Sequence, residues 1–269
     1  MDNVIFVNTD LPDIIELKNV NQIYLDKKTK KEFVAIKDLN LLIENKPGKG
    51  QFIVILGKSG CGKSTVLKYI AGLQKPTSGE ILIHGKPRTE QTKIGMIFQK
   101  YSSFPWLRVI DNVQFGLKLA GMNKNERIDK AMKMIDIVGL KGHENKFPAE
   151  LSGGQQQRVA IARSLLCSSE ILLFDEPYGA LDINTRLKMQ DFLADLWAKS
   201  LLDMTIIFVT HDISEAVYLG DEIWIMGANP GRIIERISID IPLTRSKEMK
   251  REKKFTDYVY YIEDRLNSI

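Results

Sequence analysis

A glycine-rich stretch in the first quarter of the chain has the composition of a phosphate-binding loop. It follows the apolar run 51–56 and precedes a helical pattern over 64–71. Its sequence is Gly57-Lys58-Ser59-Gly60-Cys61-Gly62-Lys63-Ser64-Thr65. The glycines let backbone N–H groups point at phosphate oxygens, at the positive end of the following helix. We expect Lys63 to reach the β- and γ-phosphates and the Ser64 hydroxyl to ligate Mg²⁺.

Two adjacent carboxylates, Asp175 and Glu176, follow the apolar run 171–174. An acidic turn after a strand is common, but ligands of parallel sheets collect at the strands' carboxyl ends, and the phosphate loop needs a metal partner there. Asp175 is expected to hold Mg²⁺, through water. Glu176 is expected to orient and deprotonate an attacking water.

Between these two elements lies a third motif, Leu151-Ser152-Gly153-Gly154-Gln155. In this order the three motifs make the chain resemble the ATP-binding cassette (ABC) family over nearly its whole length. In that family the signature motif of one subunit meets the nucleotide of another. The Ser152 hydroxyl and the N–H groups of Gly153 and Gly154 would form an anion site at the start of the helix 155–167. The resemblance therefore implies a homodimer, or a dimer with a homologous ATPase subunit.

Three further positions match motifs of the family, in the family's order. Gln99, at the end of the strand 94–98, matches the glutamine that senses Mg²⁺ and the γ-phosphate. Asp182 matches the loop that crosses the dimer interface, and His211 matches the histidine that contacts the γ-phosphate. The resemblance thus assigns catalysis to Glu176, His211 and Gln99, and the metal to Ser64, Gln99 and Asp175. It assigns ATP to the phosphate loop, Asp182 and the signature residues, Gln155 included.

Adenine recognition in the family uses an aromatic residue on an early strand. Tyr24 has the expected position before the phosphate loop, and Phe33 is the alternative across the turn 27–31. A neutral ring stacks on a base with little selectivity. Either ring could instead pack on the sheet; we favour Tyr24.

The chain divides into regions with different patterns. Short apolar strands at 14–20, 33–43 and 80–84 dominate up to residue 98, while the middle shows helical spacing over 123–138. Strands and helices alternate afterwards, which indicates parallel α/β winding. With the resemblance, this predicts an α/β fold, a single ABC ATPase domain over 1–269. Its expected parts are a P-loop NTPase (RecA-like) core (1–99 and 158–245) with an N-terminal antiparallel β region, an inserted α-helical subdomain (100–157) and a C-terminal helical tail (246–269).

Composition is that of an ordinary globular protein, with 44% hydrophobic and 27% charged residues. No apolar run approaches the length of a membrane span, and the start is no signal peptide. Cys61 and Cys167 have no metal spacing, and a disulfide would disrupt the phosphate loop, so we expect a reducing cytoplasm. The net charge of +4 is too small to indicate nucleic acid. His84 and His143 lie outside the motifs and are interpreted as ordinary surface or turn residues.

Two segments resemble the ATPase subunits of bacterial nitrate, sulfonate and taurine importers: Phe104-Pro105-Trp106-Leu107 and the segment 226–233. This resemblance implies integral membrane permease subunits as partners, and a periplasmic or lipoprotein solute-binding protein as an indirect one. The location it implies is the cytoplasmic face of the cell membrane. Phe104 and Trp106 would either form core packing of the subdomain or contact a permease helix.

The tail has apolar residues at helical spacing, among them Phe255 and Ile262, and a basic start. An amphipathic helix docked on the ATPase core is the favoured interpretation, and attraction to anionic lipid is the alternative. Two other functions compete with that of a transport ATPase. Cassettes that act on DNA or ribosomes carry long coiled-coil insertions or two cassettes in tandem, which this chain lacks. A regulatory module without turnover is disfavoured because Glu176 and His211 are both present.

Overall fold

The computed structural model describes residues 12–25, 31–46, 48–89, 92, 94–99, 103–167, 170–200 and 203–269. Within them, the central element is a six-stranded sheet with the order β10-β9-β3-β8-β7-β6. Neighbouring strands pair in parallel except β10, which is antiparallel to β9. The strands are β3 (Gln51–Leu56), β6 (Gly95–Ile97), β7 (Ile171–Asp175), β8 (Thr205–Thr210), β9 (Glu222–Gly227) and β10 (Arg232–Ser238).

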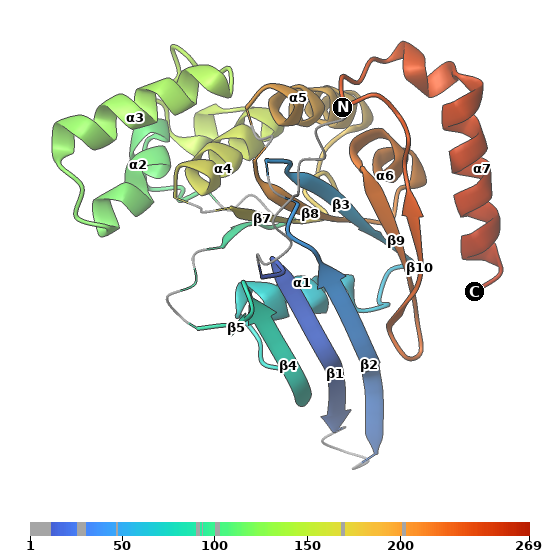
Figure 1. The fold of residues 1–269 in the computed structure, drawn as a ribbon. Helices are drawn as coiled ribbons and strands as arrows, with labels where there is room; N and C mark the ends of the chain where they lie inside the picture. Colours follow the sequence, from blue (N-terminus) through green and yellow to red (C-terminus); the bar gives the residue numbers. More distant parts are fainter. Residues whose placement is uncertain are drawn as a thin grey trace, which may run out of the picture.

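The side chains of β3 alternate between two hydrophobic cores. Phe52, Val54 and Leu56 join the core with α5 (Ile183–Ser200), α6 (Ile213–Leu219) and α7 (Lys253–Asn267). Ile53 and Ile55 join the core with α1 (Lys63–Ala71) and the second sheet. The central sheet is therefore covered on both faces, as its continuous apolar strands require, with α5 and α6 on one side and α1 on the other (Figure 1).

The second sheet is antiparallel and contains four strands in the order β2-β1-β4-β5. It comprises β1 (Ile15–Leu25), β2 (Glu32–Ile43), β4 (Ser78–Ile83) and β5 (Lys86–Pro87). This is the N-terminal antiparallel region that the sequence predicts. Ile36 of β2 pairs with Gly231, which fixes this sheet against the turn between β9 and β10.

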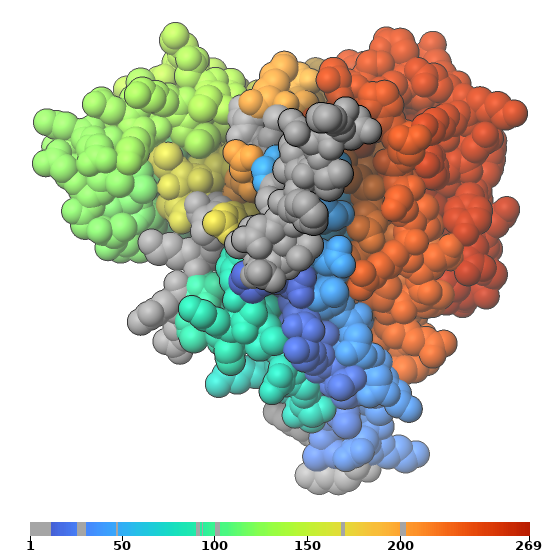
Figure 2. Space-filling view, viewed as in Figure 1, coloured from blue at the N-terminus to red at the C-terminus, as the bar shows by residue number. Residues whose placement is uncertain are grey.

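A separate helical unit lies at one end of the central sheet, opposite the C-terminal tail (Figure 2). It contains α2 (Val109–Leu119), α3 (Lys124–Ile137), the short 3₁₀ turn Pro148–Glu150 and the first part of α4 (Gly153–Cys167). These elements share a hydrophobic core of their own. Helix α4 continues past the expected boundary at 157/158: Val159 packs in the helical core, whereas Ile161 packs against the central sheet. One helix thus links the subdomain to the core.

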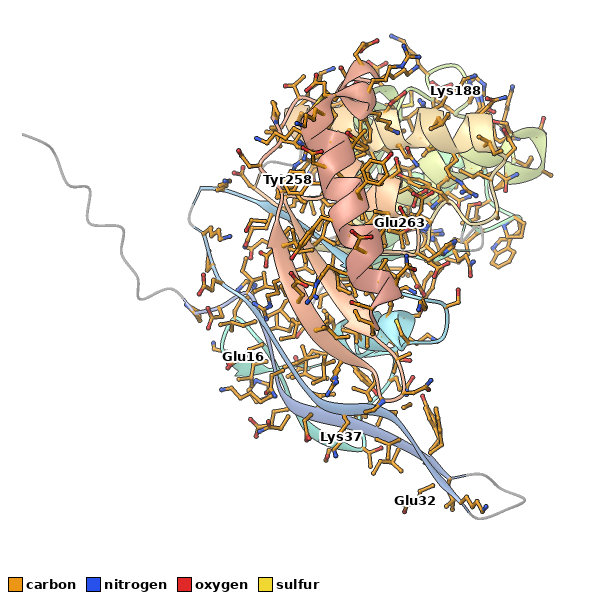
Figure 3. All side chains as sticks on the ribbon, turned by 90° about the vertical axis from the view of Figure 1, so that its right-hand side faces the viewer. Glu16, Glu32, Lys37, Lys188, Tyr258 and Glu263 are labelled. Carbon is orange, nitrogen blue, oxygen red and sulfur yellow. The ribbon has the colours of Figure 1, made fainter. Side chains whose placement is uncertain are left out.

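The C-terminal tail begins with a 3₁₀ turn at Glu248–Arg251 and continues into α7. Phe255 and Ile262 of α7 are buried in the core that contains α5 and α6. Next to this apolar stripe, Arg265 forms an ion pair with Glu235 of β10 at 2.6 Å, and α7 lies in front of that strand in Figure 3. The tail helix is docked by its apolar stripe, as its spacing predicts. Among the described residues, no helix is long and apolar enough to cross a bilayer.

Candidate nucleotide-binding site

The phosphate loop connects the buried strand β3 to α1 and has the geometry of an anion cradle. A Cβ atom on Gly57 would lie 2.4 Å from the carbonyl oxygen of Met226, so only glycine fits there. Gly62 has a φ of 107° and is the N-cap of α1, without any side-chain cap hydrogen bond. The first N–H groups of a helix have no partner within it. With no cap side chain in the way, they are available to phosphate oxygens.

Lys63 places a buried ammonium group at the base of the loop; its side chain is 3% exposed. The Nζ atom donates to the carbonyls of Gly57 at 2.8 Å and Lys58 at 3.1 Å, and lies 3.7 Å from Glu176 Oε1. Carbonyl partners hold the cation in place without cancelling its charge. Lys63 is therefore positioned to bind the terminal phosphates that the sequence assigns to it.

Ser64 and Asp175 meet across the sheet edge. The Ser64 hydroxyl donates to Asp175 Oδ1 at 2.6 Å. Burial raises the pKa of the Asp175 carboxyl, and the hydrogen bond from Ser64 opposes part of that shift. No group of three or more His, Cys, Asp or Glu side chains in the described parts of the chain could hold a metal. One hydroxyl and one carboxylate suit Mg²⁺, which is commonly held by one or two protein ligands plus phosphate and water oxygens.

Glu176 and His211 form a pair at the ends of neighbouring strands β7 and β8. His211 Nδ1 lies 3.1 Å from Glu176 Oε2. The backbone N–H of Glu176 donates to the Val209 carbonyl at 3.1 Å, which ties the residue to β8. Because parallel strands end at one edge, Glu176 and His211 can stand beside the phosphate loop, although they come 111 and 146 positions after Thr65 in the sequence. A carboxylate with a histidine partner can accept a proton from water there.

Gln99 follows β6 at the same edge and is exposed. Its side chain lies over Gly179: a Cβ atom on that glycine would be 2.8 Å from Gln99 Nε2. The glutamine therefore touches the segment that leads from Glu176 to Asp182. Together with Lys63, Ser64 and Asp175, it belongs to one sheet edge, as the sequence predicts.

The signature residues lie at the start of α4, outside the edge of the central sheet. Ser152 and Gln155 cap α4 reciprocally: Gln155 N–H donates to Ser152 Oγ at 3.4 Å, and Ser152 N–H donates to Gln155 Oε1 at 3.0 Å. The amide of Gln155 also lies 3.1 Å from His143 Nε2. His143, interpreted from the sequence as an ordinary residue, thus holds a signature side chain. No local pattern indicates this contact, because the residues meet only through the fold.

Asp182 caps the start of α5, where its Oδ1 accepts the Thr185 N–H at 3.0 Å. The hydrogen bonds from Thr185 hold the pKa of the Asp182 carboxyl below its ordinary value. Ser152 and Asp182 are both exposed. Among the described residues, no hydrogen bond joins either of them to the phosphate loop of the same chain. The structure thus separates the predicted site residues into two groups.

Both candidates for adenine stacking lie at the outer end of the β1–β2 hairpin. Tyr24 and Phe33 are directly opposite in the register of the two strands. They are 44% and 55% exposed. Gln74 Nε2 donates to the Tyr24 hydroxyl at 3.1 Å, which restrains that ring. The sequence alone does not indicate this partner of the tyrosine hydroxyl, because Gln74 lies 50 positions further along the chain.

The two aromatic side chains after Gln99 differ in their surroundings. Phe104 packs at 4.7 Å from the Phe115 ring, and the Arg163 guanidinium lies 4.6 Å from its centroid. Trp106 is 70% exposed and touches Phe104 by one side. Phe104 therefore belongs to the packing of the subdomain. Trp106 is the exposed member of the pair.

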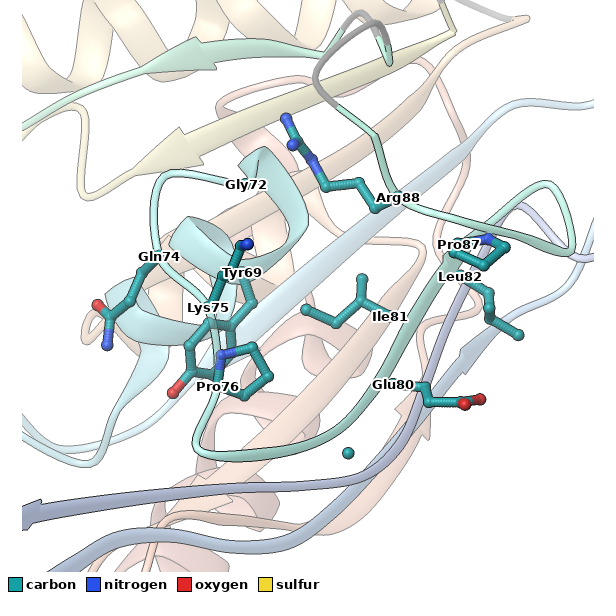
Figure 4. A pocket seen from close by; sticks show the side chains of 11 residues that line it. Tyr69, Gly72, Gln74, Lys75, Pro76, Glu80, Ile81, Leu82, Pro87 and Arg88 are labelled. Atoms are coloured by element: carbon teal, nitrogen blue, oxygen red, sulfur yellow. The ribbon is translucent and has the colours of Figure 1, made fainter.

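A cavity of about 250 Å³ lies at the other end of α1, between that helix and β4 (Figure 4). Arg88 closes it by donating to the carbonyls of Ile70, at 3.3 Å, and Ala71. These carbonyls are the negative end of α1, where an arginine is favourable. The cavity is therefore distinct from the phosphate cradle at the helix N-terminus.

The phosphate loop, the acidic end of β7 and the parallel sheet between them define a P-loop nucleoside triphosphatase. The ABC transporter profile matches residues 38–179. The chain is 43% identical over 251 residues to the nitrate import ATP-binding protein NrtD of a Synechocystis species, covering 91% of each chain. It is 46% identical over 217 residues to the aliphatic sulfonates import ATP-binding protein SsuB of Bacillus licheniformis, covering 79% of this chain and 80% of the relative.

A solved structure agrees with the fold. The dimeric post-hydrolysis state of the ATP-binding cassette MJ0796, bound to ADP and Pi, superposes with a TM-score of 0.68 at 33% identity. The superposed region covers 85% of this chain and 100% of the MJ0796 chain. The chain belongs to the ABC transporter family, and it is an ATP-binding ATPase subunit of that family. The sequence-based predictions of family, fold and ATP hydrolysis are confirmed.

Proposed function

We propose that this chain drives an importer of small oxyanions of the nitrate, sulfonate and taurine type, as a homodimer beneath separate membrane permease subunits. The observation that carries the proposal is the complete hydrolytic set in one chain: Lys63, Asp175, Glu176 and His211 meet at one sheet edge. The import proteins for nitrate and sulfonates that resemble the chain over most of its length support the substrate class.

Hydrolysis uses the groups at that edge in distinct roles. The loop N–H groups and Lys63 bind the phosphates and oppose their charge. Ser64, Asp175 and Gln99 would hold Mg²⁺, which would neutralise charge that develops on the phosphate oxygens. Glu176 takes the proton of the attacking water, and His211, held against it at 3.1 Å, contacts the γ-phosphate.

Two chains are needed for one complete site. Ser152, Gly153 and Gly154 form a helix N-terminus that can bind an anion, and Ser152 is exposed, so a partner chain could reach it. Packed head to tail, each chain would present this surface and Asp182 to the ATP held by its partner's phosphate loop. Tyr24 would stack on the adenine. Both surfaces exist in one sequence, so a homodimer suffices and contains two equivalent sites.

Transport follows if dimer closure moves a surface that the permease touches. Gln99 lies beside Gly179 at the γ-phosphate edge, and the chain then enters the helical subdomain near Trp106. A change at the phosphate can be passed on as a rotation of that subdomain. The permease would receive the movement, and a solute-binding protein would act on its far side. The subunit would thus sit peripherally at the cytoplasmic face of the membrane.

The test is to purify the chain with its permease, place the complex in vesicles and measure ATP hydrolysis and uptake. Nitrate, an alkanesulfonate or taurine should stimulate both, and Glu176→Gln should abolish both. Stimulation by an unrelated solute would contradict the substrate class. Stimulation of the isolated chain by nucleic acid or ribosomes, with none by vesicles, would overturn the transport role.

A further inference from the structure

A buried polar chain joins the C-terminal tail to the loop that carries His211. Lys250 of the tail donates from Nζ to Gln190 Oε1 of α5 at 2.8 Å. Gln190 donates from Nε2 to Glu215 Oε1 of α6 at 3.1 Å. The other oxygen of Glu215 accepts the hydroxyl of Thr210, the last residue of β8, at 2.7 Å. Three contacts therefore lead from the tail to the residue before His211.

At the end of this hydrogen-bond network away from Lys250, the residues before and after His211 are both fixed by hydrogen bonds. The hydroxyl of Thr210 accepts the backbone N–H of Asp212 at 3.0 Å. Asp212 Oδ1 in turn accepts the backbone N–H of Glu215 at 3.0 Å. Glu215 is therefore hydrogen-bonded to the residues on both sides of His211: to Thr210 through its carboxylate and to Asp212 through its backbone N–H. The direction in which the imidazole leaves the backbone depends on this frame.

The orientation of the Gln190 amide is fixed by the two charged groups that it contacts, Lys250 and Glu215. An ammonium group only donates and a carboxylate only accepts, so the Gln190 amide must turn its oxygen to Lys250 and its nitrogen to Glu215. Gln190 and Glu215 are 3% and 5% exposed, so water cannot readily replace a lost partner. Lys250 is held in turn by the Tyr218 ring, whose centroid lies 4.0 Å from Nζ. Removing the ammonium would leave the Gln190 amide oxygen without its donor, so that only the hydrogen bond to Glu215 would hold the amide.

We propose that Lys250 is a positioning residue for hydrolysis: through Gln190 and Glu215 it fixes the loop that presents His211 to the γ-phosphate. The inference rests on the proposed role of His211. It makes the docked tail part of the hydrolytic machinery and gives a surface far from the nucleotide a route to control turnover. Lys250 itself touches neither ATP nor water at the reacting phosphate.

The kinetic test compares Lys250→Met with Lys247→Met in the full chain. Lys247 lies in the same tail and pairs with Asp191 at an exposed position, so it is a matched control for charge. Lys250→Met should lower kcat about three- to tenfold, the range that network substitutions commonly give. KM for ATP should stay unchanged, because the phosphate loop and Tyr24 are not involved. Lys247→Met should leave kcat unaltered.

A spectroscopic test separates positioning from general destabilisation. The chain has three histidines, so their ring signals can be resolved and assigned by NMR. In Lys250→Met the His211 signal should move while those of His84 and His143 stay in place. This readout is independent of catalysis: if His211→Ala proves active, the proposed role of His211 fails, yet the ring position is still measured.

Gln190→Met breaks the same chain from its middle with little change in volume, and it should shift the same signal and lower kcat in the same way. It serves also where Lys250→Met does not fold. A folded Lys250→Met or Gln190→Met variant with an unmoved His211 signal, or with wild-type kcat, overturns the proposal. A lower unfolding temperature alone, with kcat and the His211 signal unchanged, assigns the network to stability only and likewise overturns it.

Discussion

Glu176 has a left-handed backbone, with φ at 44°, which residues with a side chain rarely adopt. Such a conformation costs on the order of 1 kcal/mol and persists only where the surroundings hold it. Here the hydrogen bonds of Glu176 to Val209 and Gly179 fix the backbone. In this backbone conformation the Glu176 carboxylate lies between Lys63 and His211, with one oxygen near each of them.

Replacing Glu176 by Gln tests its role as the base. The amide keeps the shape but cannot take a proton, so turnover should fall by about 100-fold or more. ATP binding should be kept, and gel filtration should show an ATP-bound dimer. Steady-state activity at the wild-type level would contradict the assignment.

The adenine assignment is tested by comparing Tyr24→Ala with Phe33→Ala. Loss of a stacking ring weakens base binding by about 1–3 kcal/mol, so Tyr24→Ala should raise the dissociation constant for ATP roughly fivefold or more. Phe33, directly opposite on β2, is the matched control. A larger loss of affinity in Phe33→Ala, measured by titration calorimetry, would transfer the stacking role to Phe33.

At the scale of the elements, the helical subdomain presents one exposed tryptophan beside a packed phenylalanine. Trp106→Ala should leave ATP binding unchanged and uncouple transport from hydrolysis in reconstituted vesicles, because large aromatic residues often dominate an interface. Uptake at the wild-type rate would show that the permease docks elsewhere.

Phe104 is the matched control for that substitution. It packs on Phe115 and Arg163, so Phe104→Ala should lower the free energy of unfolding by about 2–3 kcal/mol. The urea midpoint of each variant measures the difference. Equal destabilisation by the two alanine variants would mean that both rings are core.

The docked tail makes an equally specific prediction. Ile262 is fully buried and Tyr260, two residues away, is 65% exposed. Ile262→Ala should destabilise the chain by about 2–4 kcal/mol, while Tyr260→Ala should change stability by less than about 0.5 kcal/mol. If thermal unfolding shows no difference, or if removal of Ile262 instead abolishes binding to anionic vesicles, the lipid alternative regains support.

The sequence predicts those elements whose residues form a clear local pattern. Strands β3 and β7 are continuous apolar runs, and the order of loop, signature and carboxylates places them on one sheet. The sequence does not indicate helix α2 by its periodicity, because buried polar side chains interrupt the apolar pattern. Asn112, fully buried, is explained only by the fold: it donates to the carbonyls of Phe104 and Leu107.

The same reason limits prediction of the site. Lys63, Ser64, Asp175 and Glu176 are recognised because each belongs to a local motif. Contacts such as His143 with Gln155, or Lys250 with Gln190, join residues 12 and 60 positions apart without a pattern in either segment. Such partners are specified by packing between elements.

For the whole molecule, the central element of the proposed function is that one chain carries both halves of a nucleotide site and holds them apart. The phosphate loop lies between β3 and α1, whereas Ser152 caps the start of α4 in the helical subdomain. α4 links that subdomain to the central sheet, so a rotation of the subdomain would carry the signature with it. In the proposed function, a second chain completes the site.

Mixing two inactive variants tests this claim most directly. Lys63→Ala disables one half of the site and Ser152→Arg the other, so neither homodimer should hydrolyse ATP. A mixed dimer contains one intact site, built from the phosphate loop of the Ser152→Arg chain and the signature of its partner. An equimolar mixture should therefore recover up to about a quarter of wild-type activity. No recovery, in a mixture that native mass spectrometry shows to contain mixed dimers, would contradict the composite site.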